Sequence, residues 1–514
     1  MMEKQVEQSI DILREELPLQ RFVGECISQA VVEGEVALPG GLREETRVLT
    51  GEAMVVAERA AVENGRVLVD GKTAFHILYT QGDPTKVSAL EASADFSHTA
   101  DIPGALAGMT APVSLMVEHV EASAQGGRLH LMAVVRVHAR VFTDEPISVV
   151  TGVRGAEGLM THAETLRSIR TVGYGAQDVL IRDECELGSA LQITDTLYAT
   201  ATAAVQDVMG GEGRATLSGT IQLEATHLSD MPSRPVVITR HSIPFEETVV
   251  VSGENGDELC CRAVVRDVAV ISQEGTQEGE RTLRAEVLLG LRAESTRTRD
   301  ACLLLDAYTT QGDVLALDKQ DVRRAIARRQ LHTAESGKLT LVLDGQPPVR
   351  TPVKATLRPV MTELSRAGGR LTVEGMMEAS LLYMTDDDPA PKVYLTEEPF
   401  RAVFACDPSL PESLTLTAAS VDPVTITSDR VEIKYILHLD CYDVQLSSVP
   451  FITQVTAQPA PPDEPGILMC FSQPGETVWE LAKRYRVNPD SLRSMNPDLK
   501  DSSAGGQRVI LWKR

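Results

Sequence analysis

Short runs of alternating apolar and polar residues dominate the chain from about residue 19 to residue 450. Examples are Leu129–Val135 and Val431–Leu437, which are rich in Val, Ile and Leu. A period of two, with β-branched residues in the runs and Gly, Asp and Pro between them, is typical of β-strands. The regular spacing predicts a mainly β fold built from antiparallel sandwich-like or barrel-like units.

A seven-residue motif occurs three times in this region. It starts with Gly-Arg and ends with Gly, at residues 65–71, 213–219 and 369–375. A second strand led by Arg follows each copy, with Arg-to-Arg separations of 62 (66 to 128), 67 (214 to 281) and 60 (370 to 430) residues. The first Gly suits a hairpin turn that requires positive φ, and the last Gly suits a β-bulge. The motif therefore predicts a repeated fold and no ligand site.

The repeats predict three β-rich units, at 18–155, 175–297 and 335–450. Between the first two units, Ala163–Arg167 is expected to be helical or irregular. Between the second and third, the basic residues 319–329 fit a short helix or a strand, and periodicity does not decide between them.

The first seventeen residues predict a helical leader. Val6, Ile10, Leu13 and Leu17 recur at helical spacing, with Glu and Lys between them. The start of the chain has no apolar stretch of the kind that a secretory signal requires, so this leader is not expected to be a targeting segment.

Residues 457–466 predict a linker. Four of the seven residues at 459–465 are proline, which favours a semi-rigid, polyproline-like spacer. Such a spacer is expected to hold the last module, 467–514, away from the β-rich body.

The last module reads as strand, helix, helix, strand. Thr477 and Glu480 have the spacing of a capping box, and Asn488-Pro489 supplies an N-cap followed by proline at the first helical position. Val478, Leu481, Ala482 and Tyr485 make one apolar stripe on the first helix. The pattern predicts a small βααβ domain.

Charge separates this module from the rest of the chain. The formal net charge is −24 over 514 residues, whereas residues 466–514 contain eight basic and five acidic side chains, a net charge of +3. The remaining chain is then −27. An acidic body disfavours nucleic acid and anionic membranes, and a basic module suits an acidic protein or an anionic glycan.

The chain offers little sign of catalysis or membrane insertion. Eight scattered cysteines without a C-x-x-C pair indicate buried thiols in a reducing compartment, and no run of 18 apolar residues predicts a membrane span. The H-E-x-x-H, G-x-S-x-G and P-loop motifs are absent. His130 and His138 lie about 26 Å apart along one strand, too far to share a metal. We therefore expect a cytosolic protein with no catalytic residue, metal or cofactor.

The last module resembles the LysM family. The matching segments are Gly475–Ala482, Tyr485–Val487, Leu492–Asn496 and Gly506–Val509, with Glu476 in place of the usual Asp and Trp512 in place of the final Pro. The resemblance implies a groove for N-acetylglucosamine between two loops. The residues that it assigns to ligand or partner binding are Ser472, Gln473, Pro474, Gly475, Glu476, Thr477, Asn496, Pro497, Asp498, Leu499 and Lys500.

The order of three β-rich repeats, a proline-rich linker and a LysM module resembles the SipL/SPOCS-type spore-coat proteins. The Gly-Arg motifs fit the repeated domain of that family, as do Leu78-Tyr79 and Leu382-Tyr383, whereas the second repeat departs with Thr226-His227. The resemblance implies a non-catalytic scaffold on the mother-cell side of the forespore surface. It also implies docking through the LysM module to a coat-basement ATPase like stage IV sporulation protein A. A peptidoglycan-binding cell-wall protein is the alternative.

Overall fold

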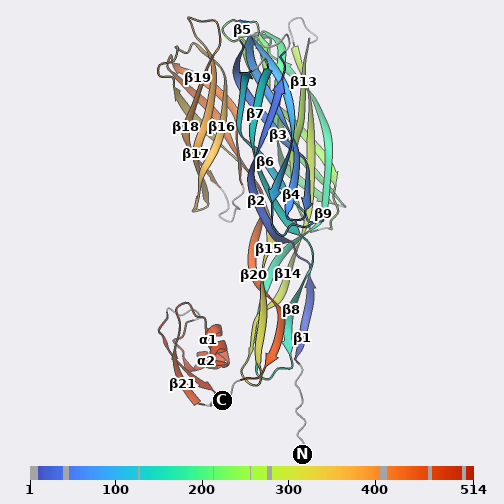
Figure 1. Cartoon of the computed structure of the whole chain (residues 1–514), viewed down its shortest axis with the longest axis vertical. Coiled ribbons are helices and arrows are strands. Elements are labelled where there is room, and N and C mark those ends of the chain that lie inside the picture. Colours follow the sequence, from blue (N-terminus) through green and yellow to red (C-terminus); the bar gives the residue numbers. More distant parts are fainter. Residues whose placement is uncertain are drawn as a thin grey trace, which may run out of the picture.

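The protein has a broad head above a narrow stalk in the computed structural model (Figure 1). The structure describes residues 10–38, 46–125, 128–211, 213–254, 256–274, 281–405, 414–460, 466–500 and 505–513. Strands make up most of the described chain, and two short α-helices lie near its C-terminal end. The fold is mainly β, as the alternating pattern predicts.

The first unit of the head contains six strands in two sheets, with orders β3-β4-β5 and β2-β7-β6, and the second of these joins β15 of the third unit through the single pair Arg21–Arg324. β3 lies beside β6 and β2 beside β5, so the two sheets close around one apolar core in a barrel-like arrangement. The strands are β2 (Arg21–Val36), β3 (Arg47–Glu63), β4 (Arg66–Gln81), β5 (Asp83–Asp101), β6 (Val113–Gln125) and β7 (Arg128–Thr143).

The second and third units repeat this strand order, each around its own core. The second has sheets β10-β11-β12 and β13-β14-β9, and the third has β16-β17-β18 and β19-β20-β15. The strands of the second unit are β9 (Leu159–Leu187), β10 (Ile193–Gly211), β11 (Arg214–Ser229), β12 (Val236–Val250), β13 (Glu258–Glu274) and β14 (Arg281–Thr309). Those of the third are β15 (Val314–Val342), β16 (Thr351–Ala367), β17 (Arg370–Met384), β18 (Lys392–Ala405), β19 (Thr415–Thr427) and β20 (Arg430–Gln458).

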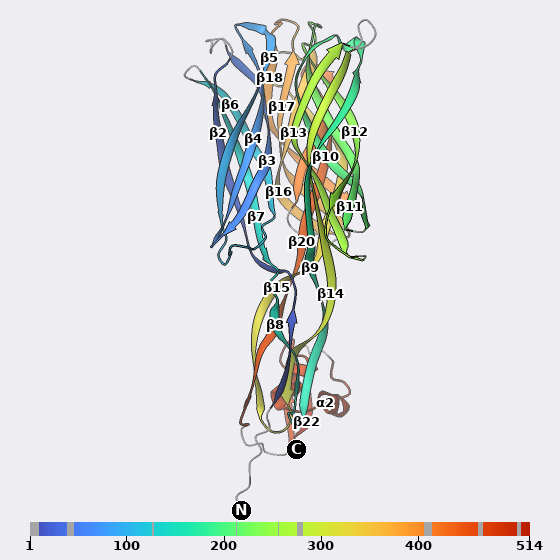
Figure 2. The same cartoon turned by 90° about the vertical axis from the view of Figure 1, so that its right-hand side faces the viewer.

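The stalk consists of three antiparallel ribbons, one from each unit. The outer halves of β9 and β14 pair in one ribbon, and those of β15 and β20 pair in another. The third ribbon joins β1 (Asp11–Leu17) to β8 (Ile147–Arg154). Apolar side chains from all three ribbons pack together inside the stalk, including Val149, Leu303 and Phe451. Figure 2 shows the β9–β14 and β15–β20 ribbons running continuously from the head into the stalk.

The stalk corrects two expectations from the sequence, for residues 11–17 and 163–167, and decides the open alternative for residues 319–329 in favour of a strand. Residues 11–17 form a strand and not a helix, because Ile10 and Ile12 pack into the stalk core at strand spacing. Ala163–Arg167 lies within β9, and residues 319–329 lie within β15. β9, β14, β15 and β20 each run for 29 residues through head and stalk, and so extend beyond the limits 175–297 and 335–450 that the sequence predicts for the second and third units. Residues 1–9 of the expected leader lie outside the described chain.

The three Gly-Arg motifs occupy equivalent positions. Gly65, Gly213 and Gly369 have φ of +80°, +78° and +73° in the turns that lead into β4, β11 and β17, as predicted. β7, β14 and β20 begin at the second arginine of each repeat. Each closing glycine pairs with a residue on the strand before it and with a residue on the strand after it. The preceding strand has a register shift at this point, and the following strand has a phenylalanine opposite the glycine. The three pairs are Gly71 with Phe96, Gly219 with Phe245, and Gly375 with Phe400.

Replacing Gly219 with alanine should destabilise the second unit. A Cβ atom there would lie 2.2 Å from the Ala204 carbonyl oxygen and 2.7 Å from the Phe245 ring, so the backbone must move. We expect a loss of about 2 kcal/mol in the free energy of unfolding, measured by urea denaturation. Gly188→Ala is the matched control, because no atom lies within 4 Å of its Cβ position. Equal stability of the two variants would contradict this account.

Candidate functional site

The C-terminal module forms the βααβ domain expected from the sequence. Its elements are β21 (Gly466–Phe471), α1 (Val478–Tyr485), α2 (Pro489–Met495) and β22 (Arg508–Lys513). The Thr477 hydroxyl accepts a hydrogen bond from the Glu480 backbone N–H at 3.2 Å, and the Glu480 carboxylate accepts one from the Thr477 N–H at 2.8 Å. The Asn488 side chain caps α2. The capping box and the N-cap are therefore confirmed.

The two predicted binding loops, residues 472–477 and 496–500, both contact the segment that contains Gln507. Ser472 donates its N–H to the Gln507 carbonyl oxygen at 3.0 Å, and the Gln507 side-chain amide donates to the Asp498 carbonyl oxygen at 2.9 Å. Gln507, which the sequence did not single out, thus links both loops. Exposed residues of the loops are Gln473, Pro474, Gly475, Pro497, Asp498 and Lys500.

The other predicted loop residues help to hold the domain together. Ser472 is buried, and the Asn496 amide donates to the Leu492 and Ile510 carbonyl oxygens at 2.8 and 2.6 Å. The Glu476 carboxylate pairs with Arg484 at 2.9 Å. Thr477 caps α1, and Leu499 packs against the domain core. A ligand in this region would thus contact mainly the exposed loop residues, and their role in binding stays a prediction.

An apolar strip covers the outer face of the two-stranded sheet. β21 and β22 pair Ile467 with Trp512 and Met469 with Ile510, and Phe471 lies opposite Arg508. The exposed fractions of the five apolar residues, Ile467, Met469, Phe471, Ile510 and Trp512, are 77, 62, 60, 38 and 54%. The opposite face, with Cys470, Val509 and Leu511, packs into the domain core. The sequence contains the signal for this strip, because both faces of the two strands are apolar.

The module packs against the end of the stalk, contrary to the expectation that its linker would hold it away. Tyr308 of β14 is 4% exposed, belongs to the core of the module and donates its hydroxyl to the Val487 carbonyl oxygen at 2.7 Å. The Arg486 guanidinium donates to the carbonyl oxygens of Thr309 and Gly312 at 3.0 and 2.6 Å. Residues 461–465 of the linker lie outside the described chain. The physical reason for the contact is an apolar and charged surface on α1 that fits the stalk end.

Asp306 is the charged centre of this contact. Its carboxylate accepts hydrogen bonds from the Trp479 indole N–H at 2.8 Å and from Lys483 Nζ at 2.5 Å. Burial raises the pKa of Asp306, but these hydrogen bonds and the positive charges of Lys483 and Lys319 outweigh it and leave the pKa below its usual value. The Trp479 ring lies edge-on to Tyr308, with centroids 5.0 Å apart. Trp479 therefore lies at the boundary of two domains and not wholly inside the module.

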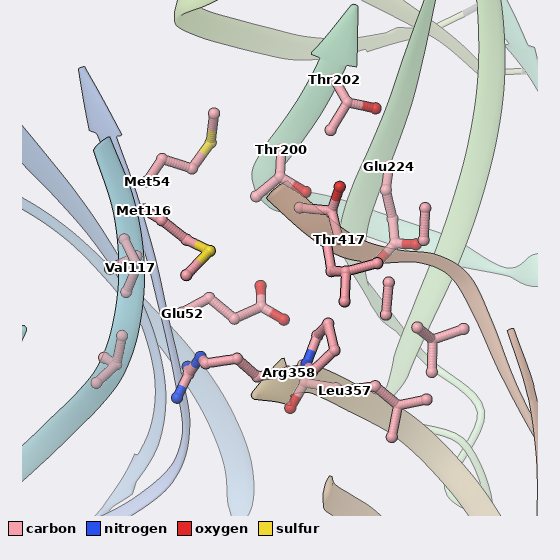
Figure 3. Close-up of a pocket in the computed structure, with 18 of the residues that line it drawn as sticks. Glu52, Met54, Met116, Val117, Thr200, Thr202, Glu224, Leu357, Arg358 and Thr417 are labelled. Carbon is pink, nitrogen blue, oxygen red and sulfur yellow. The ribbon is translucent and has the colours of Figure 1, made fainter. Parts of the chain in front are cut away.

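A large cavity lies among the three units of the head. Its volume is about 1280 Å³, and its walls come mainly from β3 and β6, β10 and β13, and β16 and β19. Figure 3 shows Glu52, Thr200 and Arg358 around this space, with Met54 and Met116 on one wall. The three units contribute equivalent strands, so the cavity follows their approximate threefold arrangement.

A buried polar cluster adjoins the cavity and joins all three units. Lys354 of the third unit, 1% exposed at its side chain, contacts the Glu52 carboxylate of the first unit at 3.0 Å. It also donates to the Tyr198 hydroxyl of the second unit at 2.7 Å. Burial lowers the pKa of Lys354, but the charge of Glu52 outweighs this effect and raises the pKa above its usual value. The ammonium group is therefore charged and depends on Glu52.

The charged side chains around the cavity form ion pairs within one unit and also approach a second unit. Arg240 pairs with Glu224 and donates to the Val421 carbonyl oxygen, whereas Glu378 pairs with Arg358 at 2.8 Å and lies 3.9 Å from His119. In the described part of the chain, no group of three His, Cys, Asp or Glu residues is placed to hold a metal ion. No described helix is long and apolar enough to cross a membrane. Arg240 therefore links the second unit to the third, and Glu378 of the third unit lies next to His119 of the first.

Comparison with family models identifies two domains in this chain. Residues 46–125 match the SPOCS domain of SipL, and residues 473–503 match the LysM domain. The first match covers β3 to β6 of the first unit, and the second covers both helices of the module. Comparison with curated proteins and with solved structures found no match.

The chain is therefore a modular β protein of the binding type, with a SPOCS domain in its head and a LysM domain at its C-terminal end. The resemblance to SipL/SPOCS-type proteins with a LysM module is confirmed. These domains indicate a sporulation-related protein that carries a module of the glycan-binding type. Both are binding domains and neither is catalytic.

Proposed function

We propose that this protein is a non-catalytic scaffold for assembly of the spore coat, which docks to an acidic coat-basement protein through its LysM domain. The proposed partner is an ATPase like stage IV sporulation protein A, and the proposed place is the mother-cell side of the forespore surface. The apolar strip of Ile467, Met469, Phe471, Ile510 and Trp512 carries the proposal. A contiguous exposed apolar face with polar surroundings is typical of a protein interface.

Charge supports a protein partner as well. The domain is basic, at +3, on a body of −27, so an acidic partner is attracted to this end of the molecule and repelled by the rest. Arg508 borders the strip directly, opposite Phe471. The apolar strip would supply the centre of the interface, and the basic residues would orient the partner.

Met469→Glu should abolish this docking. The side chain lies in the middle of the strip and is 62% exposed, so the carboxylate does not disturb the core but would be buried without a partner in the interface. We expect at least a tenfold loss of affinity for the purified ATPase, measured by biolayer interferometry with the full chain. Leu395→Glu is the matched control, since Leu395 is 72% exposed on the head.

Peptidoglycan binding is the alternative function, favoured by the LysM match. It is tested by co-sedimentation of the full chain with insoluble peptidoglycan, using Lys500→Glu to probe the exposed loops. We expect the full chain and Met469→Glu to sediment to the same low extent. If the chain sediments, Lys500→Glu stays soluble and the ATPase does not bind, the protein is a glycan-binding protein instead.

A further inference from the structure

The α1 surface that contacts the stalk is a second recognition surface of the LysM domain. It consists of Trp479, Lys483 and Arg486, which lie four and three residues apart and therefore share one side of the helix and its end. The apolar strip and the exposed loop residues belong to other parts of the domain. The α1 surface therefore shares no residue with the apolar strip or with the exposed loop residues.

The stalk end of the same chain, which contacts the α1 surface, shows which chemistry this surface recognises. The stalk end supplies one carboxylate, Asp306, to both Trp479 and Lys483, and one aromatic ring, Tyr308, to the domain core. Thr309 and Gly312 add two carbonyl oxygens for Arg486. The site thus fits a strand end that carries an acidic and an aromatic residue two positions apart, followed by a turn.

A second copy of the chain offers this same stalk end. Exchange of the LysM domain between copies would need no new contact, because every hydrogen bond and ring contact made within one chain can be made between two chains. The opposite charges of Asp306 and Lys483 attract each other in either arrangement. The seven residues at 459–465, four of them proline, would span about 22 Å if extended.

We propose that the LysM domain docks on the stalk end of a second copy when copies are concentrated, and so links this protein to itself. Each chain then gives one LysM domain and receives one. Such a contact between unlike surfaces extends into open chains unless the geometry closes a ring. In dilute solution the contact within one chain prevails, because tethering gives it an effective concentration in the millimolar range. This self-association is independent of the ligand that the loops or the apolar strip bind.

Two charge reversals test the exchange. With Lys319 and Lys483, Asp306→Lys brings three cations together at the contact, and Lys483→Asp places two anions there beside Lys319. Each variant therefore loses the central ion pair both within its own chain and with its own kind. A mixture of the two restores opposite charges at every contact between unlike chains. We expect each variant alone to have the mass of a monomer by light scattering, and the equimolar mixture to at least double that mass.

The fluorescence of Trp479 reports the contact directly. The chain has two tryptophans, so Trp512→Phe leaves Trp479 as the only one. We expect a red shift of its emission in each charge-reversed variant and recovery in their mixture and in the double variant D306K/K483D. The full-length chain is used throughout, because Tyr308 completes the core of the LysM domain.

The outcomes separate the two arrangements. A mixture that stays at the monomer mass, although the double variant recovers its emission, would show that the contact forms only within one chain and would overturn the proposal. Unchanged emission in the single variants would also overturn the proposal, because it would show that Trp479 does not contact the stalk end in the parent chain. A parallel pair, Lys338→Asp with Glu432→Lys, reverses an ion pair on the head and is expected to stay monomeric when mixed.

Discussion

Glu52→Ala is expected to lower the free energy of unfolding by about 3–5 kcal/mol, the range for breaking a buried ion pair from one side. Lys354 is buried and charged, and Glu52 is its acidic contact in the cluster where the three units meet. Without Glu52 the ammonium group still contacts the hydroxyl groups of Tyr198 and Thr226, and the charge of Glu224 still favours it, but its direct carboxylate partner is lost. Urea denaturation of the full chain measures the loss.

The matched comparisons make this prediction specific to the cluster. Glu63→Ala removes an exposed partner of Arg66 and should cost less than about 1 kcal/mol. The double variant Glu52→Leu with Lys354→Met removes both charges, and we expect it to recover much of the lost stability. If the double variant is no more stable than Glu52→Ala, the loss does not arise from an unpaired charge.

Acidification from pH 6.5 to pH 4 is expected to destabilise the second unit by about 3 kcal/mol through His227 alone. Burial, and to a smaller degree the nearby His241, lowers the pKa of His227 to about 4, whereas the unfolded chain has the ordinary value of 6.5. Between these values the unfolded chain binds a proton that the folded chain does not. The stability is therefore complete above pH 6.5 and falls as the pH is lowered.

His227→Gln should flatten this dependence, because an amide can still bond to the hydroxyl groups of Thr196 and Thr239 without titrating. Urea denaturation at a series of pH values compares the slopes. His130→Gln, on the outer face of the first unit, is the control and should keep the slope of the parent chain. An unchanged slope in His227→Gln would mean that other groups, such as His241, carry the dependence.

Local sequence patterns were enough to predict strands, turns and caps in this protein. The Gly-Arg motif identified the turns into β4, β11 and β17, because positive φ at a hairpin turn depends on the glycine itself. The capping box of α1 was readable for the same reason, since both partners lie within four residues.

Long-range pairing explains what the sequence could not predict. Residues 11–17 have apolar residues at helical spacing, but β8, more than 130 residues away, pairs with them as a strand. The stalk strands look like head strands in their alternation, so no local signal marks where one body ends and the other begins. Asp306 and Tyr308 likewise stand in an ordinary strand, and their role appears only when the LysM domain lies against them.

The second repeat departs from the Leu-Tyr pattern of the other two repeats, and the structure gives the reason. Thr226 and His227 replace the Leu-Tyr pair of the other two repeats. Thr226 faces the Lys354 cluster, and His227 is fully buried between two threonines. The departure therefore supplies polar partners at the junction of the units, which the sequence alone reported only as a weaker match.

The 29-residue strands also set the distance between the two ends of the molecule. At about 3.3 Å per residue, β14 spans roughly 95 Å from the far end of the head to the end of the stalk. The LysM domain lies at one end of that distance, and the turns of the head lie at the other. A partner bound by the LysM domain would therefore be separated from a partner bound to the far end of the head by most of that length.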